Sequence, residues 1–249
     1  MKQGIKSWHF SDRVLLTAYA VWIAIGILVT LLHLTGQGIA AWSLGPFHLP
    51  GFLPKFVDAC LAWGDPILIL LAAGNTHLIV SRIWGPRPAR KWFVALFLIS
   101  GLIELIGTKT GFPFGPYAYT ENFGPRISLL PVAIPLAWYV LLSNGLILWR
   151  AFLPGFILPI EAAATATLVT GIDWVMEPFA AKIKVYWIWN TAGGLAPQKT
   201  YIAWWIVAFL LVLLFAKSPG HQERFEPRPL FLLGTMLLLF VVTRRVYGM

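Results

Sequence analysis

Long apolar stretches follow one another along the chain, separated by short segments rich in glycine, proline or charged residues. Most of them are long enough for an α-helix to cross a hydrocarbon core of roughly 30 Å. The pattern predicts seven transmembrane helices, at residues 14–34, 57–80, 92–109, 129–149, 156–178, 201–216 and 229–243. The last two are short for a full crossing, so we expect them to tilt little or to lie in a thinned bilayer. We therefore predict an all-α integral membrane protein, a bundle of about seven helices that forms a single domain over residues 1–249.

The composition supports a membrane location and excludes several kinds of site. Hydrophobic residues make up 58% of the chain and charged residues only 12%, which is about half the charged share of a soluble domain. The single cysteine, Cys60, excludes an intramolecular disulfide and a cysteine-based metal site. The histidines are scattered, which argues against a di-iron hydroxylase, and no Asp-rich motif is present to hold magnesium diphosphate.

The basic residues predict the orientation of the chain. The net charge of +9 comes from Lys and Arg between apolar stretches, so we interpret it as a topology signal and lipid contact rather than nucleic-acid binding. With the N-terminus in the cytoplasm, 11 of the 19 Lys and Arg lie on the cytoplasmic side and 8 on the other. Residues 82–91, with four basic residues, are the best anchor. The first apolar stretch is too long for the core of a signal peptide, so we expect it to remain as a helix.

Five acidic residues lie within or at the ends of apolar stretches, where a bilayer disfavours charge. They are Asp65, Glu104, Glu161, Asp173 and Glu177. A charged side chain at mid-membrane costs roughly 3 kcal/mol on insertion scales, so such residues usually face the interior of a bundle. The predicted helix directions place all except Glu161 in one layer, in the outer half of the membrane. Glu161 precedes Asp173 by roughly 18 Å of helix, and therefore belongs to another layer or to the inner boundary.

Each of these carboxyl groups also has a structural interpretation. The ion-pair partners available are Lys109, Lys182 and Lys184. Asp65 precedes Pro66 deep in a helix, so its carboxylate could cap backbone groups that a proline kink exposes. For Glu177, at a helix end, the structural and functional interpretations are equal. For Glu104 and Asp173 we favour function, because intramembrane ionisable residues are functional by default.

A glycine-rich aromatic segment follows the third predicted helix, at residues 104–119. Its repeated glycines and prolines favour a folded-in or re-entrant loop with unusual backbone angles. Aromatic residues here and in a second segment near residue 187 could line a pocket for a long apolar substrate; an interfacial aromatic belt is the alternative. The candidate substrate-binding residues are Phe112, Phe114, Tyr117, Tyr119, Trp138, Tyr186, Trp187 and Trp189.

The middle of the chain contains a faint internal repeat. Each half has an acidic residue at a helix end, an aromatic loop, a proline, and a tryptophan seven residues after that proline. The residues are Glu104, Pro131 and Trp138 in one half, and Asp173 with Glu177, Pro197 and Trp204 in the other. A parallel repeat of two helix pairs would enclose a shared site, whereas coincidence in a Pro- and Trp-rich chain is an equal alternative.

Eight residues of the glycine-rich segment form a distinctive combination: Glu104, Gly107, Thr110, Gly111, Phe114, Gly115, Tyr117 and Tyr119. Together with residues 135–138, 173–178 and 186–189, they resemble the signature of the membrane carotenoid biosynthesis proteins. That family includes the bacterial carotenoid 1,2-hydratases and the archaeal bisanhydrobacterioruberin hydratase. The resemblance covers the second to the sixth predicted helix. Residues 198–204 depart from it, because an Asn-containing segment is expected there, and this leaves the end group of the substrate open.

The resemblance implies a hydratase that acts on the ψ-end group of an acyclic or monocyclic carotenoid. Water would add across the terminal double bond and leave a tertiary hydroxyl, without a redox or metal cofactor. The implied location is a prokaryotic plasma membrane. The implied partners are the carotenoid, water, membrane lipid and other enzymes of the carotenoid pathway, and not nucleic acid.

The candidate carboxyl groups suit this chemistry. An apolar site favours the neutral form of a carboxylic acid, which can protonate an alkene as a general acid. Aromatic faces would stabilise the resulting tertiary cation, and a second carboxylate would deprotonate the incoming water. Glu104 or Asp173 would be the acid, the other of the two or Glu177 the base, and Asp65 a supporting residue. A carotenoid end-group cyclase would begin with the same protonation, and a lipid-binding protein or proton-coupled transporter would use buried acids as relay groups; both remain alternatives.

Overall fold

The computed structural model describes residues 9–33, 50–152, 155–216 and 226–248, so residue 34 of the first predicted helix lies outside the described part. Within it are seven α-helices: α1 (Phe10–Leu31), α3 (Leu53–Trp84), α4 (Pro86–Thr110), α5 (Ala133–Phe152), α6 (Leu158–Pro178), α7 (Gln198–Phe215) and α8 (Arg228–Val246). All seven predicted helices are therefore confirmed, with ends shifted by a few residues. The predicted start of the fourth helix at residue 129 is wrong, because residues 130–131 form a strand and α5 begins only at Ala133.

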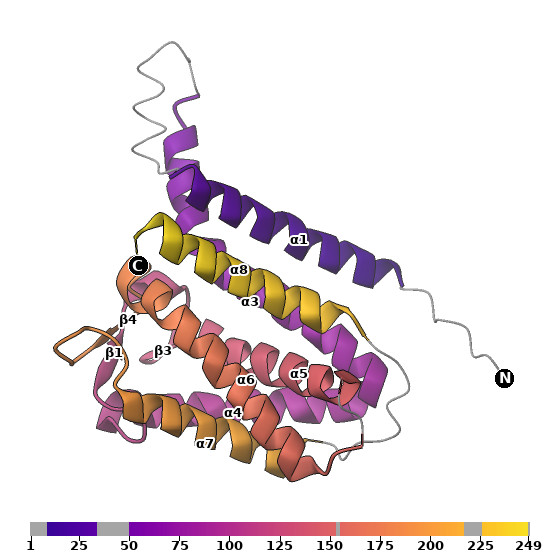
Figure 1. Ribbon diagram of the computed structural model, residues 1–249. Coiled ribbons are helices and arrows are strands. Elements are labelled where there is room, and N and C mark those ends of the chain that lie inside the picture. The colour runs from indigo at the N-terminus through magenta and orange to yellow at the C-terminus, as the bar shows by residue number, and fades with distance from the viewer. Residues whose placement is uncertain (1–8, 34–49, 153–154, 217–225, 249) are drawn as a thin grey trace.

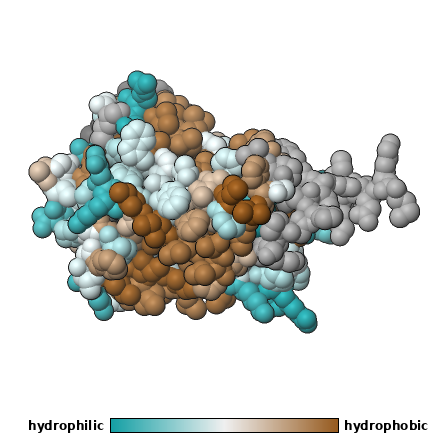
Figure 2. All heavy atoms as spheres, turned by 60° about the horizontal axis from the view of Figure 1, so that its bottom comes forward, coloured by the Kyte–Doolittle hydropathy of each residue, from teal (hydrophilic) through white to brown (hydrophobic). Residues whose placement is uncertain are grey.

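The described helices have the length and the surface of membrane-spanning segments. Six of them are long and apolar enough to cross a bilayer, namely α1, α3, α4, α5, α7 and α8. The remaining helix, α6, carries three carboxyl groups. On α1 the side chains of Val21, Ile25 and Leu28 are half exposed or more. Figure 2 shows apolar residues gathered across the middle of one face, with hydrophilic residues at its margins. An extended apolar surface of this kind fits lipid rather than water, so the chain is an integral membrane protein.

Two short antiparallel β-ribbons follow the helices that carry the candidate acids. After α4, β1 (Tyr117–Tyr119) pairs with β4 (Trp187–Trp189), which follows α6. β2 (Arg126–Ile127) pairs with β3 (Leu130–Pro131). A 3-10 turn, η1 (Glu121–Phe123), lies between β1 and β2, and a π-helical turn, η2 (Phe179–Ile183), lies between α6 and β4. The predicted folded-in loop is thus held to a second loop by strand pairing, which the sequence pattern did not indicate.

The helices lie side by side along a common direction (Figure 1). α1 and α8 pack against each other on one side of the bundle, and α4 and α7 lie on the opposite side. The central helix is α5, which packs against α3, α4, α6 and α8 and buries most of its side chains. β1, β3 and β4 all lie at one end, on the left in Figure 1, which we call the strand end.

A proline inside α3 positions one of the candidate acids. Pro66 cannot donate a backbone hydrogen bond, which is a common cause of a helix bend, and in Figure 1 the first turns of α3 point away from the rest of the helix. The indole Nε1 of Trp22 on α1 donates to the Gly64 carbonyl at 2.8 Å. A neighbouring helix thus satisfies a backbone group at the bend, and Asp65 is left to face the bundle.

Buried ion pairs fix the end of the bundle opposite the strand end. Asp12 of α1 is fully buried and pairs with Arg82 of α3 and Arg228 of α8. Arg150 at the end of α5 pairs with Glu161 at the start of α6 at 2.9 Å, and each side chain is only 3% exposed. Glu161 therefore ties two helix ends together, well separated along α6 from Asp173.

Replacing Glu161 by Gln is expected to lower the free energy of unfolding by about 3–5 kcal/mol, because Arg150 stays buried and loses its carboxylate partner. The measurement is thermal unfolding of the purified protein in detergent. Glu121→Gln is the matched control, since Glu121 forms an exposed pair with Arg126 and such pairs contribute about 0–1 kcal/mol. Equal melting temperatures for the two variants would contradict the role of the buried pair.

Candidate active site

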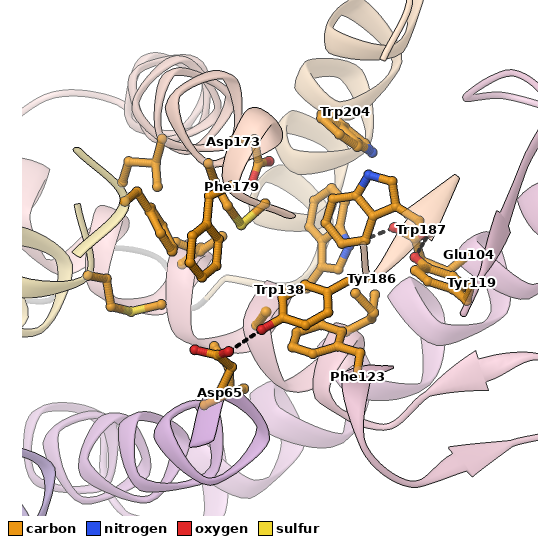
Figure 3. A pocket seen from close by; sticks show the side chains of 18 of the residues that line it. Asp65, Glu104, Tyr119, Phe123, Trp138, Asp173, Phe179, Tyr186, Trp187 and Trp204 are labelled. Atoms are coloured by element: carbon orange, nitrogen blue, oxygen red, sulfur yellow. Dashed lines mark hydrogen bonds between the residues drawn. The ribbon is translucent and has the colours of Figure 1, made fainter. Parts of the chain in front are cut away.

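A cavity lies among the helices near the strand end, with a volume of about 960 Å³ including the space at its mouth. Side chains from α3, α4, α5, α6, α7 and α8 and from both β1 and β4 line it (Figure 3). Its wall is almost entirely apolar and aromatic, but three carboxyl groups reach it: Asp65, Glu104 and Asp173. The structure thus brings acids from three helices to one apolar cavity.

Glu104 is surrounded by hydrogen-bond donors. It is 4% exposed. Its Oε2 accepts from the hydroxyls of Tyr117 at 2.6 Å and Tyr119 at 2.9 Å, and its Oε1 accepts from the indole of Trp138 at 3.0 Å. Two of these donors come from β1 and the third from α5. Three donors around one carboxyl group suit an ionised carboxylate, which only accepts.

The two tyrosines remain donors at physiological pH. Burial raises the pKa of the Tyr119 phenol well above its usual value, and the neighbouring negative charge of Glu104 raises it further. The same two causes, burial first, raise the pKa of Tyr117. An ionised phenol would meet a carboxylate of like charge in a dry site. Glu104 therefore faces two permanent hydroxyl donors.

Asp173 has the opposite surroundings. Its side chain lines the cavity and is 7% exposed. Within the described residues it has no hydrogen-bond or ion-pair partner, and in Figure 3 its carboxyl group is drawn apart from that of Glu104. An isolated charge is expensive to bury, and a carboxyl group in such a place holds its proton. Asp173 is thus suited to be a neutral acid beside an apolar ligand.

Asp65 is held as half of an ion pair. Its Oδ2 accepts a hydrogen bond from the Tyr186 hydroxyl and lies 2.8 Å from Nζ of Lys184. Tyr186 is stacked on Phe123, with ring centroids 4.0 Å apart. The carboxylate thus contacts these two side chains of the loop after α6 rather than backbone groups at Pro66, so the suggested capping of a kink gives way to an ion pair.

Glu177 lies one helical turn beyond Asp173 but is not among the residues that line the cavity. It is 1% exposed. Its Oε1 accepts from the indole of Trp189 at 2.6 Å and from the backbone N–H of Ala196 at 3.1 Å, and Trp187 donates more weakly at 3.3 Å to Oε2. Its carboxylate therefore accepts hydrogen bonds from the indole N–H groups of two tryptophans whose rings line the cavity.

The predicted substrate-binding residues fall into two groups, those that line the cavity and one that does not. Those that line the cavity are Phe114, Tyr117, Tyr119, Trp138, Tyr186, Trp187 and Trp189. Phe112 does not, and 73% of its surface is exposed. α4 ends at Thr110, and the next residue, Gly111, reverses the chain with a φ of 73°. After this turn Phe112 lies outside while Phe114 is 1% exposed. The expectation that Phe112 lines the pocket is therefore corrected.

Sequence reasoning missed the part of the cavity wall that comes from the last helix. Met236, Leu239 and Phe240 of α8 line it, together with Phe123 and Phe179 from the turns. No polar group or motif marks these residues, because ordinary apolar side chains of a membrane helix look alike in sequence. Trp204 also lines the cavity, and the repeat that pairs it with Trp138 was a signal for it.

Together the fold and the cavity define a class of protein, an integral membrane helix bundle with acidic groups in an aromatic cavity. The model of the carotenoid biosynthesis protein family matches residues 64–247, so the chain belongs to that family. It is also similar to the bisanhydrobacterioruberin hydratase of Haloarcula japonica, with 31% identity over 126 residues. The match covers 49% of this chain and 43% of that relative, so the chain spans less than half the relative's length. No solved structure matches the chain significantly.

Proposed function

We propose that the protein is a hydratase that adds water across the terminal double bond of a carotenoid ψ-end group. The family and the distant hydratase relative support a carotenoid substrate. The cavity supports it independently, because its wall suits the branched hydrocarbon end of a polyene. The three carboxyl groups supply acid–base chemistry that a purely storage or transport pocket for a hydrocarbon does not need.

The observation that carries the proposal is the contrast between Asp173 and Glu104. Both reach the same cavity. Asp173 is without a partner in the described part of the chain, whereas Glu104 accepts from three donors. Two carboxyl groups whose environments favour different protonation states are the usual equipment for paired acid and base catalysis. We assign Asp173 as the acid and Glu104 as the base.

The reaction balances with these two groups alone. The Asp173 carboxyl proton bonds to the less substituted carbon of the alkene, whose π electrons form the new C–H bond. A water oxygen then attacks the tertiary cation while Glu104 removes one of that water's protons. The proton returns from Glu104 to Asp173 through water, so the net change is the addition of one water. Aromatic faces in the wall stabilise the cation between the two steps.

Expression in a bacterium that accumulates lycopene or γ-carotene tests the proposal. The expected result is a carotenoid heavier by one water, identified by chromatography and mass spectrometry of extracts. An isomer of unchanged mass would instead indicate capture of the cation by an internal double bond, as in an end-group cyclase. Unchanged carotenoids with every ψ-ended substrate would contradict both enzyme functions.

We also propose that the N-terminus is cytoplasmic, in a prokaryotic plasma membrane. The start of α1 and the basic segment at residues 82–91 share one end of the bundle, because Asp12 pairs with Arg82, and basic segments stay on the cytoplasmic side. The cavity, near the strand end, then lies in the outer half of the membrane. A reporter enzyme that works only outside the cytoplasm, fused to the C-terminus, is expected to be active; a silent reporter on a stably inserted fusion would reverse the orientation.

A further inference from the structure

Four aromatic side chains lie on one face of the β1–β4 ribbon. Tyr117 lies opposite Trp189 and Tyr119 opposite Trp187, and directly opposed residues of an antiparallel pair project to the same side. All four line the cavity. Ala118 and Ile188 pair on the other side, where Ile188 is 57% exposed. We call these four residues the aromatic plate; its rings are in contact, with the centroids of Tyr117 and Trp189 4.9 Å apart.

Each half of the aromatic plate is tied to a carboxylate on the helix that precedes its own strand. The tyrosines of β1 donate to Glu104 of α4. The tryptophans of β4 donate to Glu177 of α6. The faint repeat in the sequence thus has a structural counterpart: two helix ends, two strands, and one carboxylate that binds the polar atoms of two aromatic rings in each half.

The two carboxylates differ in what else they can reach. Glu104 lines the cavity, whereas Glu177 does not. Three donors hold Glu177 behind the plate: two indole N–H groups and the Ala196 backbone. A group in this position does not line the space that a ligand would occupy, but it can fix how two indole rings face that ligand.

We infer that Glu177 is a positioning residue that holds the Trp187 and Trp189 rings against the substrate cation, and is neither the acid nor the base. The inference rests on the proposed hydration, because it needs a cationic intermediate. A cation near an aromatic face is stabilised most when water is excluded. A negative acceptor on the indole N–H draws electron density towards the ring, which strengthens that attraction. Well-oriented rings stabilise the cation until water captures it, whereas a poorly stabilised cation loses a proton and forms an alkene again.

Two substitutions of Glu177 separate these roles. Gln can keep an amide oxygen for Trp189 and Ala196 but removes the charge, and Ala removes every bond. For Glu177→Gln we expect turnover within about tenfold of the wild type, the size of one cation–π contact, with a fall in kcat and an unchanged KM. For Glu177→Ala we expect a larger loss and a higher ratio of double-bond isomer to hydrated product. Tryptophan fluorescence of Glu177→Ala should shift, because two indoles lose their acceptor.

The outcomes that overturn the inference are distinct. Loss of turnover in Glu177→Gln as complete as in Asp173→Asn would make Glu177 an acid or base. An unchanged product ratio in Glu177→Ala, with only a lower melting temperature, would make its role purely structural. Glu121→Gln is the control for removing a charge at the same end, since Glu121 lies in the exposed turn η1. Absence of any hydrated product from the wild type would contradict the proposed function itself, not the role of Glu177 within it.

Discussion

Asp173→Asn is expected to abolish hydration while the protein stays folded in the membrane. Asparagine has nearly the same shape but no acidic proton, so the alkene cannot be protonated. A positioned general acid contributes about 10²–10⁴-fold to a rate. The other two carboxyl groups that line the cavity already have partners among the described residues, Asp65 in an ion pair and Glu104 with three hydrogen-bond donors. The measurement is hydrated carotenoid formed per unit of folded protein in membranes.

The fold should tolerate this change. Asp173 makes no hydrogen bond or ion pair within the described residues, so a neutral amide of nearly the same shape removes no polar contact. Melting temperature in detergent should stay close to that of the wild type. Turnover by Asp173→Asn at the level of the Glu121→Gln control would remove Asp173 from the mechanism.

Glu104→Gln is expected to lose hydration activity as fully as Asp173→Asn, for a different reason. The amide oxygen can still accept from the Trp138 indole, and the amide nitrogen can donate to the oxygens of Tyr117 and Tyr119, so the hydrogen-bonded cluster can be retained. What is lost is the ability to take a proton from water and the negative charge near the cation. We expect a fall in kcat of about 10²–10⁴-fold, with carotenoid still bound.

Glu104→Ala is the matched comparison, because it also removes the acceptor for three buried donors. Each buried donor left without a partner costs about 1–3 kcal/mol, so this variant should be both inactive and much less stable. A Glu104→Gln variant that hydrates carotenoid at the wild-type rate would rule out Glu104 as the base. Equal stability of the Gln and Ala variants would contradict the hydrogen-bonded cluster.

The helices could be predicted from sequence because a membrane imposes a simple rule, roughly twenty apolar residues per crossing. α6 was predicted in the same way despite its three acids, since its remaining residues are apolar. The layer of carboxyl groups also followed from helix direction and rise. Glu161, set apart by that reasoning, pairs with Arg150 far along α6 from the cavity.

The rest of the site depends on contacts between distant segments. The pairing of Tyr117 with Trp189 joins residues from two loops, and strand register is set by tertiary packing that two three-residue strands cannot encode alone. The same holds for the ion pair of Asp65 with Lys184 and for the orientation of Glu177 away from the cavity. Phe112 and Phe114 are alike in sequence, and only the turn at Gly111 separates an exposed ring from a buried one.

The most direct test of the central claim follows the atoms of water into the product. Purified protein in detergent would be supplied with a ψ-ended carotenoid in deuterated water that also carries heavy oxygen. Protonation by Asp173 followed by capture of the cation predicts one deuterium on carbon and the heavy oxygen in the new tertiary hydroxyl, and no labelled hydrated product with Asp173→Asn. A product with deuterium but without the heavy oxygen would contradict hydration, because the cation would then have been captured by something other than water.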